Sequence, residues 1–415
     1  MSSHFIQTLI ELGLLTTVIS WCVCWCLVRG WLFQSYINDQ AAQDVQAFHT
    51  IPTPRLGGLA LAVALLAALG VEWFRFVEGE YRGLHFAWLM AAAVPCFIGG
   101  LTEDMTGRVG STQRLLLAII SAALFIGLGH ATLTRIGITW FDTALTWLPF
   151  AIVFTIFCVA GVVNAINMID GYNGLASGMV VIALLAIITV ALKVQDGLVL
   201  IISVSTLGAS LGFIVWNWPK GRLFLGDGGA YLLGFLLAEL SVLLVYRNPN
   251  VSPWFPLLLL SYPVYETLFS MYRRRWVHKS KLCEPDNRHL HQLIFDRIAL
   301  NSESRHRKAL NDKGEDELCE RSPIERTGKS SALCRKLFLV GEINGCDYAT
   351  RCADQILMDN SRVAPYLWGA NALIAICAIM FWQSTVVLIV IAAWVCVAYV
   401  VLYLRLSMNR RPDNA

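Results

Sequence analysis

Charged residues are scarce in this chain. Only 15% of its 415 residues are Asp, Glu, Lys or Arg, whereas 56% are hydrophobic and the mean hydropathy is +0.59. An ordinary soluble domain carries about 25% charged residues. The shortage therefore excludes an ordinary soluble globular protein and predicts a membrane protein.

An excess of positive charge is also missing. The formal net charge is +3, which is too small for the basic surface that nucleic-acid binding requires, so we expect no nucleic-acid partner. The start of the chain lacks the basic region of a cleavable signal peptide, and its first apolar run is too long for one. We therefore expect residues 5–33 to remain as a membrane span.

Long apolar runs, by contrast, are abundant. Each is roughly 18–25 residues long, enough to cross about 30 Å of hydrocarbon as a helix. About eleven occur, near residues 5–33, 56–76, 84–101, 115–134, 144–163, 179–195, 197–216, 229–246, 253–272, 364–382 and 384–406. The sequence predicts an all-α, polytopic integral membrane protein with about eleven transmembrane helices.

The positions of Lys and Arg predict the orientation of these helices. Arg273, Arg274 and Arg275 follow the ninth run, and Arg410 and Arg411 follow the last. Loops on the other side carry few basic residues. Because cytoplasmic loops are enriched in Lys and Arg, we expect the N-terminus outside and the C-terminus in the cytosol.

Three regions are expected along the chain. Residues 1–298 form a transmembrane catalytic core with cytosolic motif loops, and residues 361–415 supply the last two helices and a cytosolic tail. Between them, residues 299–360 are polar, carry both signs of charge and show little periodicity. We expect this stretch to be a flexible cytosolic insert that contributes little to the membrane core.

Acidic residues lie at the ends of the apolar runs, on the predicted cytosolic face. Glu103 and Asp104 follow the third run, Asp170 follows the fifth and Asp227 precedes the eighth. The acidic pair taken alone is typical of a solvated turn. Charged side chains are costly at bilayer depth, so acids gathered at one membrane face predict a functional site.

Asp227 has the residue pattern of a magnesium ligand. Gly226 and Gly228 flank it and leave its carboxylate sterically open. Mg²⁺ favours oxygen ligands and commonly binds one or two carboxylates together with substrate phosphates. The alternative is a glycine-rich connector with no role in ligand binding.

A polar stripe follows the fifth apolar run. Asn164, Asn167 and Asp170 are spaced three residues apart, which places them on one face of a helix. The glycines that follow break the helix and allow a loop to wrap a ligand. Because unpartnered amides and carboxylates are costly beside an apolar span, the stripe favours ligand binding.

Two further motifs are weaker signals. Residues 51–58, Ile-Pro-Thr-Pro-Arg-Leu-Gly-Gly, are as typical of a rigid turn before a helix as of a binding loop. In a later loop, Arg288 could clamp a phosphate, and His289 and His291 could bind phosphate oxygens or polarise a leaving group. Two histidines at this spacing are, alone, more often a coincidence than a site.

The order of these motifs resembles a known family. PTPRLGG, an acidic pair, NxxNxxDG, FLGD and PDxxHLH follow one another from about Pro52 to Leu293. This order is similar to that of the polyprenyl-phosphate N-acetylhexosamine-1-phosphate transferases, integral membrane enzymes of the WecA/MraY type in glycosyltransferase family 4. Each motif is weak alone, but five in order at suitable membrane positions are a strong signal.

The resemblance implies specific roles. Asp227 matches the main Mg²⁺ ligand, with Mn²⁺ as an alternative ion. Asp104 matches the second acid of a pair that activates the lipid phosphate or helps to hold the metal, and Glu103 and His289 complete the implied catalytic set. The implied substrate-binding residues are Arg55, Asn164, Asn167, Asp170, Asn173, Asn217, Arg288 and His291.

The sequence departs from the family pattern at three points. Glu103 replaces an aspartate, and Asn173 stands where many members carry a second aspartate. The segment His289-Leu290-His291-Gln292 replaces the three consecutive histidines of the peptidoglycan-precursor branch. The last difference argues against an N-acetylmuramoyl-pentapeptide donor and favours a simpler N-acetylated hexosamine.

The resemblance implies transfer of a sugar 1-phosphate from a UDP-sugar to undecaprenyl phosphate, with release of UMP. It implies a bacterial inner-membrane enzyme with a cytosolic site that starts a lipid-linked surface polysaccharide such as O-antigen, and it leaves a homodimer open. The alternatives are a multi-pass transporter, for which we see no inverted repeat, and an inactive scaffold, which the retained Asp104, Asp170 and Asp227 disfavour.

Overall fold

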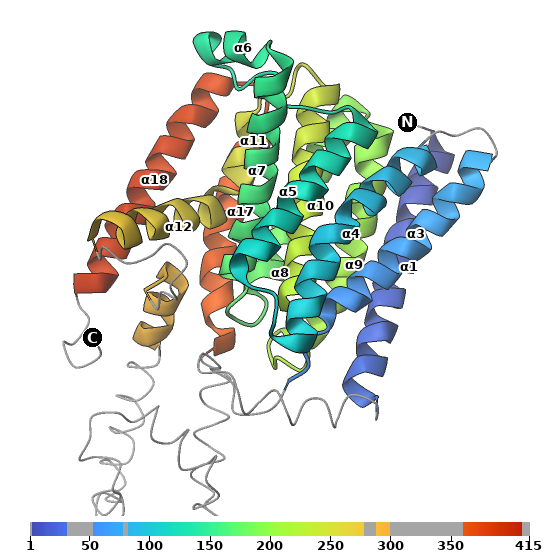
Figure 1. Cartoon of the computed structure of the whole chain (residues 1–415), viewed down its shortest axis with the longest axis horizontal. Helices are drawn as coiled ribbons and strands as arrows, with labels where there is room; N and C mark the ends of the chain where they lie inside the picture. Colours follow the sequence, from blue (N-terminus) through green and yellow to red (C-terminus); the bar gives the residue numbers. More distant parts are fainter. Residues whose placement is uncertain (1, 31–52, 78–81, 278–287, 299–359, 409–415) are drawn as a thin grey trace, which may run out of the picture.

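The computed structural model describes residues 2–30, 53–77, 82–277, 288–298 and 360–408. Within these residues, ten helices are long and apolar enough to cross a membrane. They are α1 (Ser3–Arg29), α3 (Gly57–Val77), α4 (Arg82–Thr106), α5 (Ser111–Gly129), α7 (Leu148–Ile169), α8 (Leu175–Val194), α9 (Gly197–Asn217), α10 (Gly226–Arg247), α17 (Val363–Met380) and α18 (Thr385–Met408). The all-α polytopic membrane fold predicted from the sequence is confirmed (Figure 1).

The ninth apolar run differs from the prediction of one continuous span. It forms two short helices, α11 (Trp254–Leu259) and α12 (Ser261–Tyr272), followed by the π-helical turn η2 (Arg273–Val277). Pro263 explains the break, because its ring would clash with the carbonyl of Leu259 in a continuous helix. Figure 1 shows α12 turned across the bundle, at a steep angle to α7 and α18.

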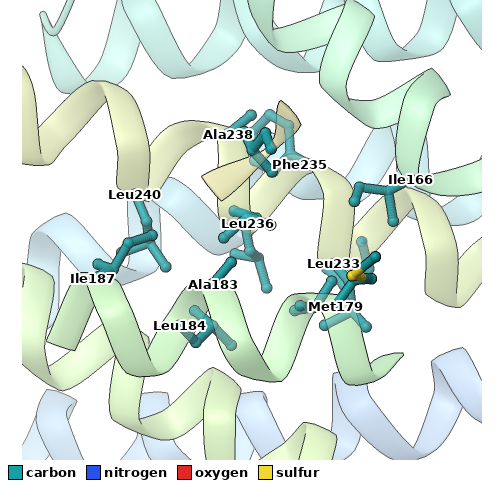
Figure 2. Close-up of a cluster of buried hydrophobic side chains, with 14 of the residues drawn as sticks. Ile166, Met179, Ala183, Leu184, Ile187, Leu233, Phe235, Leu236, Ala238 and Leu240 are labelled. Carbon is teal, nitrogen blue, oxygen red and sulfur yellow. The ribbon is translucent and has the colours of Figure 1, made fainter. Parts of the chain in front are cut away.

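Helix α10 forms the centre of the bundle. It contacts α3, α4, α5, α7, α8 and α9, and its residues from Gly228 to Val245 are all buried. A helix that is hydrophobic on all sides belongs in the interior of a protein or membrane bundle. In Figure 2, Leu236 and Leu240 of α10 face Ala183 and Ile187 of α8. Helix α10 is therefore anchored by the core of the bundle.

The outer helices present apolar side chains at the surface. Phe157 of α7 is 70% exposed, and Val386 and Trp394 of α18 are 72% and 71% exposed. Exposed apolar surface on this scale marks contact with lipid or a partner rather than with water. This surface agrees with a bundle that is embedded in a bilayer.

The motif loops lie together at one end of the bundle, which we call the site end (Figure 1). It is formed by residues 53–58, 103–111, 167–175 and 217–228. The start of α1 and the end of α18 lie at opposite ends of the bundle, and the short helix α6 (Thr139–Leu145) lies at the end away from the site. That the site end faces the cytosol stays a prediction, and the insert predicted at 299–360 falls outside the described residues except for Asn360.

Candidate active site

The centre of the site is the first turn of α10, and Asp104 caps it. The two carboxylate oxygens of Asp104 accept hydrogen bonds from the backbone N–H groups of Asp227, at 2.9 Å, and Gly228, at 2.8 Å. These are N–H groups that have no partner inside a helix, and a carboxylate there also interacts favourably with the helix dipole. Asp104 therefore fixes the backbone that carries Asp227.

The glycines of this region allow the cap to form. Gly226 has a φ of +74°, and a Cβ atom added there would lie 2.6 Å from an oxygen of Asp104. A Cβ atom added at Gly100 of α4 would lie 2.6 Å from the backbone of Asp227. A side chain at either position would push α4 away from the start of α10.

The Pro-rich motif at 51–58 is more than an isolated turn where the structure describes it, from residue 53. Phe224 N–H donates to the carbonyl of Pro54 at 2.9 Å, and Gly57 N–H donates back to the carbonyl of Phe224 at 2.9 Å. Gly58 N–H also donates to the carbonyl of Leu225 at 3.0 Å. The start of α3 thus clamps the loop that leads to Asp227.

The Asp227 carboxylate is held by one residue on each side. Asn167 Nδ2 donates to Oδ1 at 2.9 Å, and the guanidinium of Arg114 on α5 forms an ion pair with Oδ2. The Asp227 side chain is 26% exposed, so it is oriented but remains accessible. The structure brings the predicted residues Asn167 and Asp227 together and adds Arg114 to them.

Asp170 ends α7 close to this centre. Its own burial raises the pKa of its carboxyl to about 7, and the positive charge of Arg55 opposes that rise. Arg55 itself is exposed at the site end. Asn164 is exposed on α7 about one turn before Asn167, and the structure gives it no contact with Asp227. The predicted stripe is therefore divided between the site and the surface of the bundle.

Asn217 and Asn173 join two loops of the site end. Asn217 accepts a hydrogen bond from Gly174 N–H at 2.6 Å and donates to the carbonyl of Leu223 at 2.8 Å. Asn173 Nδ2 donates to the carbonyl of Pro219 at 3.0 Å. Both side chains are buried. They shape the loops, and direct contact with substrate stays a prediction.

The histidine segment reaches the same loops. His291 Nδ1 lies 3.0 Å from the hydroxyl of Tyr262, and a Cβ atom added at Gly171 would lie 3.7 Å from His291 Nε2. Burial lowers the pKa of His291 to about 3, so its imidazole is neutral. The His289 ring stacks on it with 5.3 Å between ring centroids. The structure thus places the predicted histidines beside the turn that contains Asp170.

Glu103 and Arg288, two other residues predicted for the site, have no contact with the Asp227 carboxylate among the hydrogen bonds and ion pairs described above. The Glu103 carboxylate accepts a hydrogen bond from Val109 N–H at 2.7 Å, so it stabilises the turn between α4 and α5. Arg288 is exposed just before the histidines. The Arg288 side chain is accessible for an anionic ligand.

The donor set at the site fits Mg²⁺ through few protein ligands. Among the described residues, no group of three or more His, Cys, Asp or Glu side chains is arranged to hold a metal ion. Mg²⁺ often uses only one or two carboxylates and completes its shell with water and phosphate oxygens. The accessible oxygens of Asp227, with Asp104 on the adjacent helix end, match that requirement.

Several residues around the site were missed by the sequence analysis. Arg114 pairs with Asp227, Glu266 pairs with His289, and Tyr262 pairs with His291. Glu266 carried a usable signal, because an acid inside an apolar run is costly and is a functional candidate. The pairing of Arg114 depends on tertiary structure and has no local signature.

Comparison with known proteins points to one family. The model of glycosyl transferase family 4 matches residues 85–245, a stretch that contains Asp104, Asn167, Asp170 and Asp227. Over these residues the chain is similar to that family. The resemblance inferred from the motif order is confirmed.

Two relatives are each 28% identical to this chain over the residues that align. A probable undecaprenyl-phosphate N-acetylglucosaminyl 1-phosphate transferase of Bacillus subtilis is 28% identical over 244 residues, 58% of this chain and 65% of that protein. A decaprenyl-phosphate N-acetylglucosaminephosphotransferase of Mycobacterium leprae is 28% identical over 276 residues, covering 60% of this chain and 67% of that protein.

A third relative belongs to another branch. A phospho-N-acetylmuramoyl-pentapeptide-transferase of Streptococcus mutans is 28% identical over 248 residues, 58% of this chain and 73% of that protein. This chain therefore spans about two thirds of the length of the relatives it matches. None of these three is named a transporter, and the transporter alternative is not favoured.

Proposed function

We propose that this protein transfers an N-acetylhexosamine 1-phosphate group from a UDP-sugar to undecaprenyl phosphate and releases UMP. The observation that carries the proposal is Asp227 at the capped start of the buried helix α10, where Asn167 and Arg114 hold its carboxylate. This carboxylate is accessible at one end of a membrane bundle. A lipid phosphate and a water-soluble nucleotide sugar could both reach that position.

The chemistry requires two anions to meet. An oxygen of the acceptor phosphate forms a bond to the sugar-linked phosphorus of the donor, and the bond from that phosphorus to UMP breaks. Repulsion between the phosphates must be offset and the groups held in line. The exposed cations Arg55 and Arg288 would receive the phosphates. His289 stacks on His291, which lies beside the turn at Gly171.

Mg²⁺ is the cofactor that we propose, with Mn²⁺ as an alternative. Asp227 would hold it together with Asp104, and it would neutralise charge on the donor diphosphate. Asp104 also caps α10, so this residue would combine a structural role with a role in binding.

The proposed donor sugar, membrane location and product rest on the sequence motifs and on the names of the relatives. The His289-Leu290-His291 segment and the names of the Bacillus and Mycobacterium relatives favour an N-acetylglucosamine donor. We propose a bacterial inner-membrane location with the site facing the cytosol, where nucleotide sugars are made. The product would start a lipid-linked surface polysaccharide such as O-antigen.

The decisive experiment measures UMP release by the purified protein in lipid nanodiscs. The donors would be UDP-N-acetylglucosamine, UDP-N-acetylgalactosamine and UDP-N-acetylmuramoyl-pentapeptide, each with and without undecaprenyl phosphate and with EDTA or Mg²⁺. We expect UMP and a labelled lipid product only when a simple N-acetylhexosamine donor, the lipid acceptor and Mg²⁺ are all present. Absence of UMP release with every donor would refute the proposal.

A further inference from the structure

A buried carboxylate, Glu266 on α12, lies directly behind the histidine segment. It is 0% exposed, and both of its oxygens accept hydrogen bonds. One oxygen lies 2.9 Å from His289 Nδ1. The other accepts from the backbone N–H of Leu290 at 3.1 Å and from the hydroxyl of Tyr399 on α18 at 2.8 Å.

The partners of Glu266 determine its protonation and that of the histidine. The Leu290 N–H can only donate, and the Tyr399 hydroxyl donates to the same oxygen, so these two hydrogen bonds favour the ionised form of the carboxylate. An ionised carboxylate only accepts hydrogen bonds, so the proton on the His289 ring must lie on Nδ1. Nε2 of His289 is then the nitrogen left for a ligand.

The histidine that Glu266 holds is part of the site. The His289 ring stacks on His291, and His291 in turn lies beside the turn at Gly171. The side chain of His289 is 8% exposed, so its neighbours enclose the ring almost completely. A change in the orientation of this ring would redirect Nε2.

We propose that Glu266 is a positioning residue that holds the His289 imidazole with Nε2 directed to the reacting phosphates. In the same arrangement, Tyr399 orients Glu266, so that the last helix, α18, supports a site built mainly from earlier helices. This inference rests on the proposed transferase function. It assigns roles to two residues that lie outside the five sequence motifs.

A merely structural role is the competing explanation, because Glu266 and Tyr399 also tie α12 to α18. The chain offers a matched control for that explanation. Tyr265, the neighbour of Glu266 on α12, donates its hydroxyl to the carbonyl of Ala392 on α18 at 2.9 Å. Tyr265→Phe therefore removes a hydrogen bond between the same two helices without touching Glu266.

The first test compares three full-length variants in nanodiscs by UMP release. We expect Glu266→Gln to lower kcat about tenfold or more with little change in the donor KM, because the loss concerns the transition state. Tyr399→Phe should lower kcat about threefold to fivefold, since the carboxylate stays but loses one of its donors. Tyr265→Phe should remain within about twofold of the wild type.

The second test asks whether Glu266 acts through His289. In the His289→Ala background, residual transfer of a radiolabelled sugar phosphate would be measured with and without Glu266→Gln. A positioning residue has nothing further to lose once its partner is gone, so we expect no additional decrease. Losses that multiply would show that Glu266 acts independently of His289, and would overturn the inference.

The outcomes separate this inference from the proposed function. A wild-type protein that releases no UMP with any donor refutes both. An active wild type with Glu266→Gln equal to Tyr265→Phe refutes the positioning role and leaves the function intact. Thermal midpoints in detergent check folding, and if Glu266→Gln does not fold, Tyr399→Phe and its double variant with His289→Ala carry the same test.

Discussion

The two ends of the helix bundle use polar residues in opposite ways. At the end away from the site, buried Asp196 accepts hydrogen bonds from Val199 N–H, Arg247 Nε and Asn248 Nδ2 at 3.3, 2.8 and 3.0 Å. Close by, Arg135 donates to the carbonyls of Val245, Asn248 and Val251. There, the ionised groups close loops and cap helices.

At the site end, acids are gathered instead of dispersed. Asp104 and Asp170 are close enough to repel each other, and Asp227 lies at the start of the adjacent helix. The cations Arg55 and Arg288 are exposed there. Arg114 pairs with Asp227, whereas Asp104 and Asp170 repel each other. Like charges held together reduce stability, so this end of the bundle is the candidate for function.

Asp227→Asn should cause the largest loss of turnover of the variants considered. The asparagine keeps an oxygen that can accept from Asn167, so the fold should survive, but the charge that we assign to metal binding is lost. We expect turnover to fall about a hundredfold or more, because a charge used in the transition state is removed. UMP release and the thermal midpoint of the same preparation measure the two effects, and near-normal activity would contradict the assignment.

Arg114→Gln should have a smaller effect at the same place. Its guanidinium is the ion-pair partner of Asp227, and loss of that charge lets the carboxylate move. We expect turnover to fall about tenfold. Arg108→Gln is the matched control, because Arg108 is exposed in the loop before α5. Equal activity of the two variants would show that the ion pair has no role in transfer.

The helices and several site residues could be predicted from the sequence. Hydrophobic run length predicted the helices, since ten of the eleven runs form single long helices and the ninth is interrupted near Pro263. Motif order predicted the family and placed Asp104, Asn167 and Asp227 at one end. Both inferences depend on local composition and spacing, which a sequence shows directly.

The remainder depends on contacts between distant segments. The pairing of Arg114 with Asp227 and that of Glu266 with His289 exist only after helices pack. The engagement of Asn217 with Gly174 and Leu223 depends on the conformation of two loops. No spacing rule distinguishes an amide that binds substrate from one that binds backbone.

Asp196→Asn should disturb the opposite end without affecting the chemistry. It removes the charge that pairs with Arg247 and keeps the shape of the side chain. Because a buried group loses a charged partner, we expect the thermal midpoint in detergent to fall by several degrees. UMP release per folded molecule should stay at the wild-type level.

Glu11→Gln provides the control for this end. Glu11 is exposed and its carboxylate lies 4.0 Å from the guanidinium of Arg75. Exposed ion pairs contribute little to stability, so the midpoint should hardly change. A decrease in activity per folded molecule in Asp196→Asn would contradict the assignment of a stabilising role to this end and a chemical role to the site end.

The smallest effect concerns the pH dependence of stability at Asp170. Burial raises the pKa of this carboxyl to about 7, and Arg55 opposes the rise. In the unfolded chain the pKa is about 3.9. Between these values the folded protein holds a proton that the unfolded chain has released, so stability falls as pH rises through this range.

Asp170→Asn removes this dependence, because an amide does not ionise. We therefore expect the thermal midpoint of the variant, relative to the wild type, to rise from pH 5 to about pH 7, to level off above that pH, and to be higher than that of the wild type at pH 8. Measurements on both proteins in one detergent across this range provide the test. A constant difference would mean that the folded carboxyl is already ionised at pH 5. The site end would then hold the Asp170 carboxylate at no cost in stability, and the contrast with the fully partnered Asp196 at the opposite end would be lost.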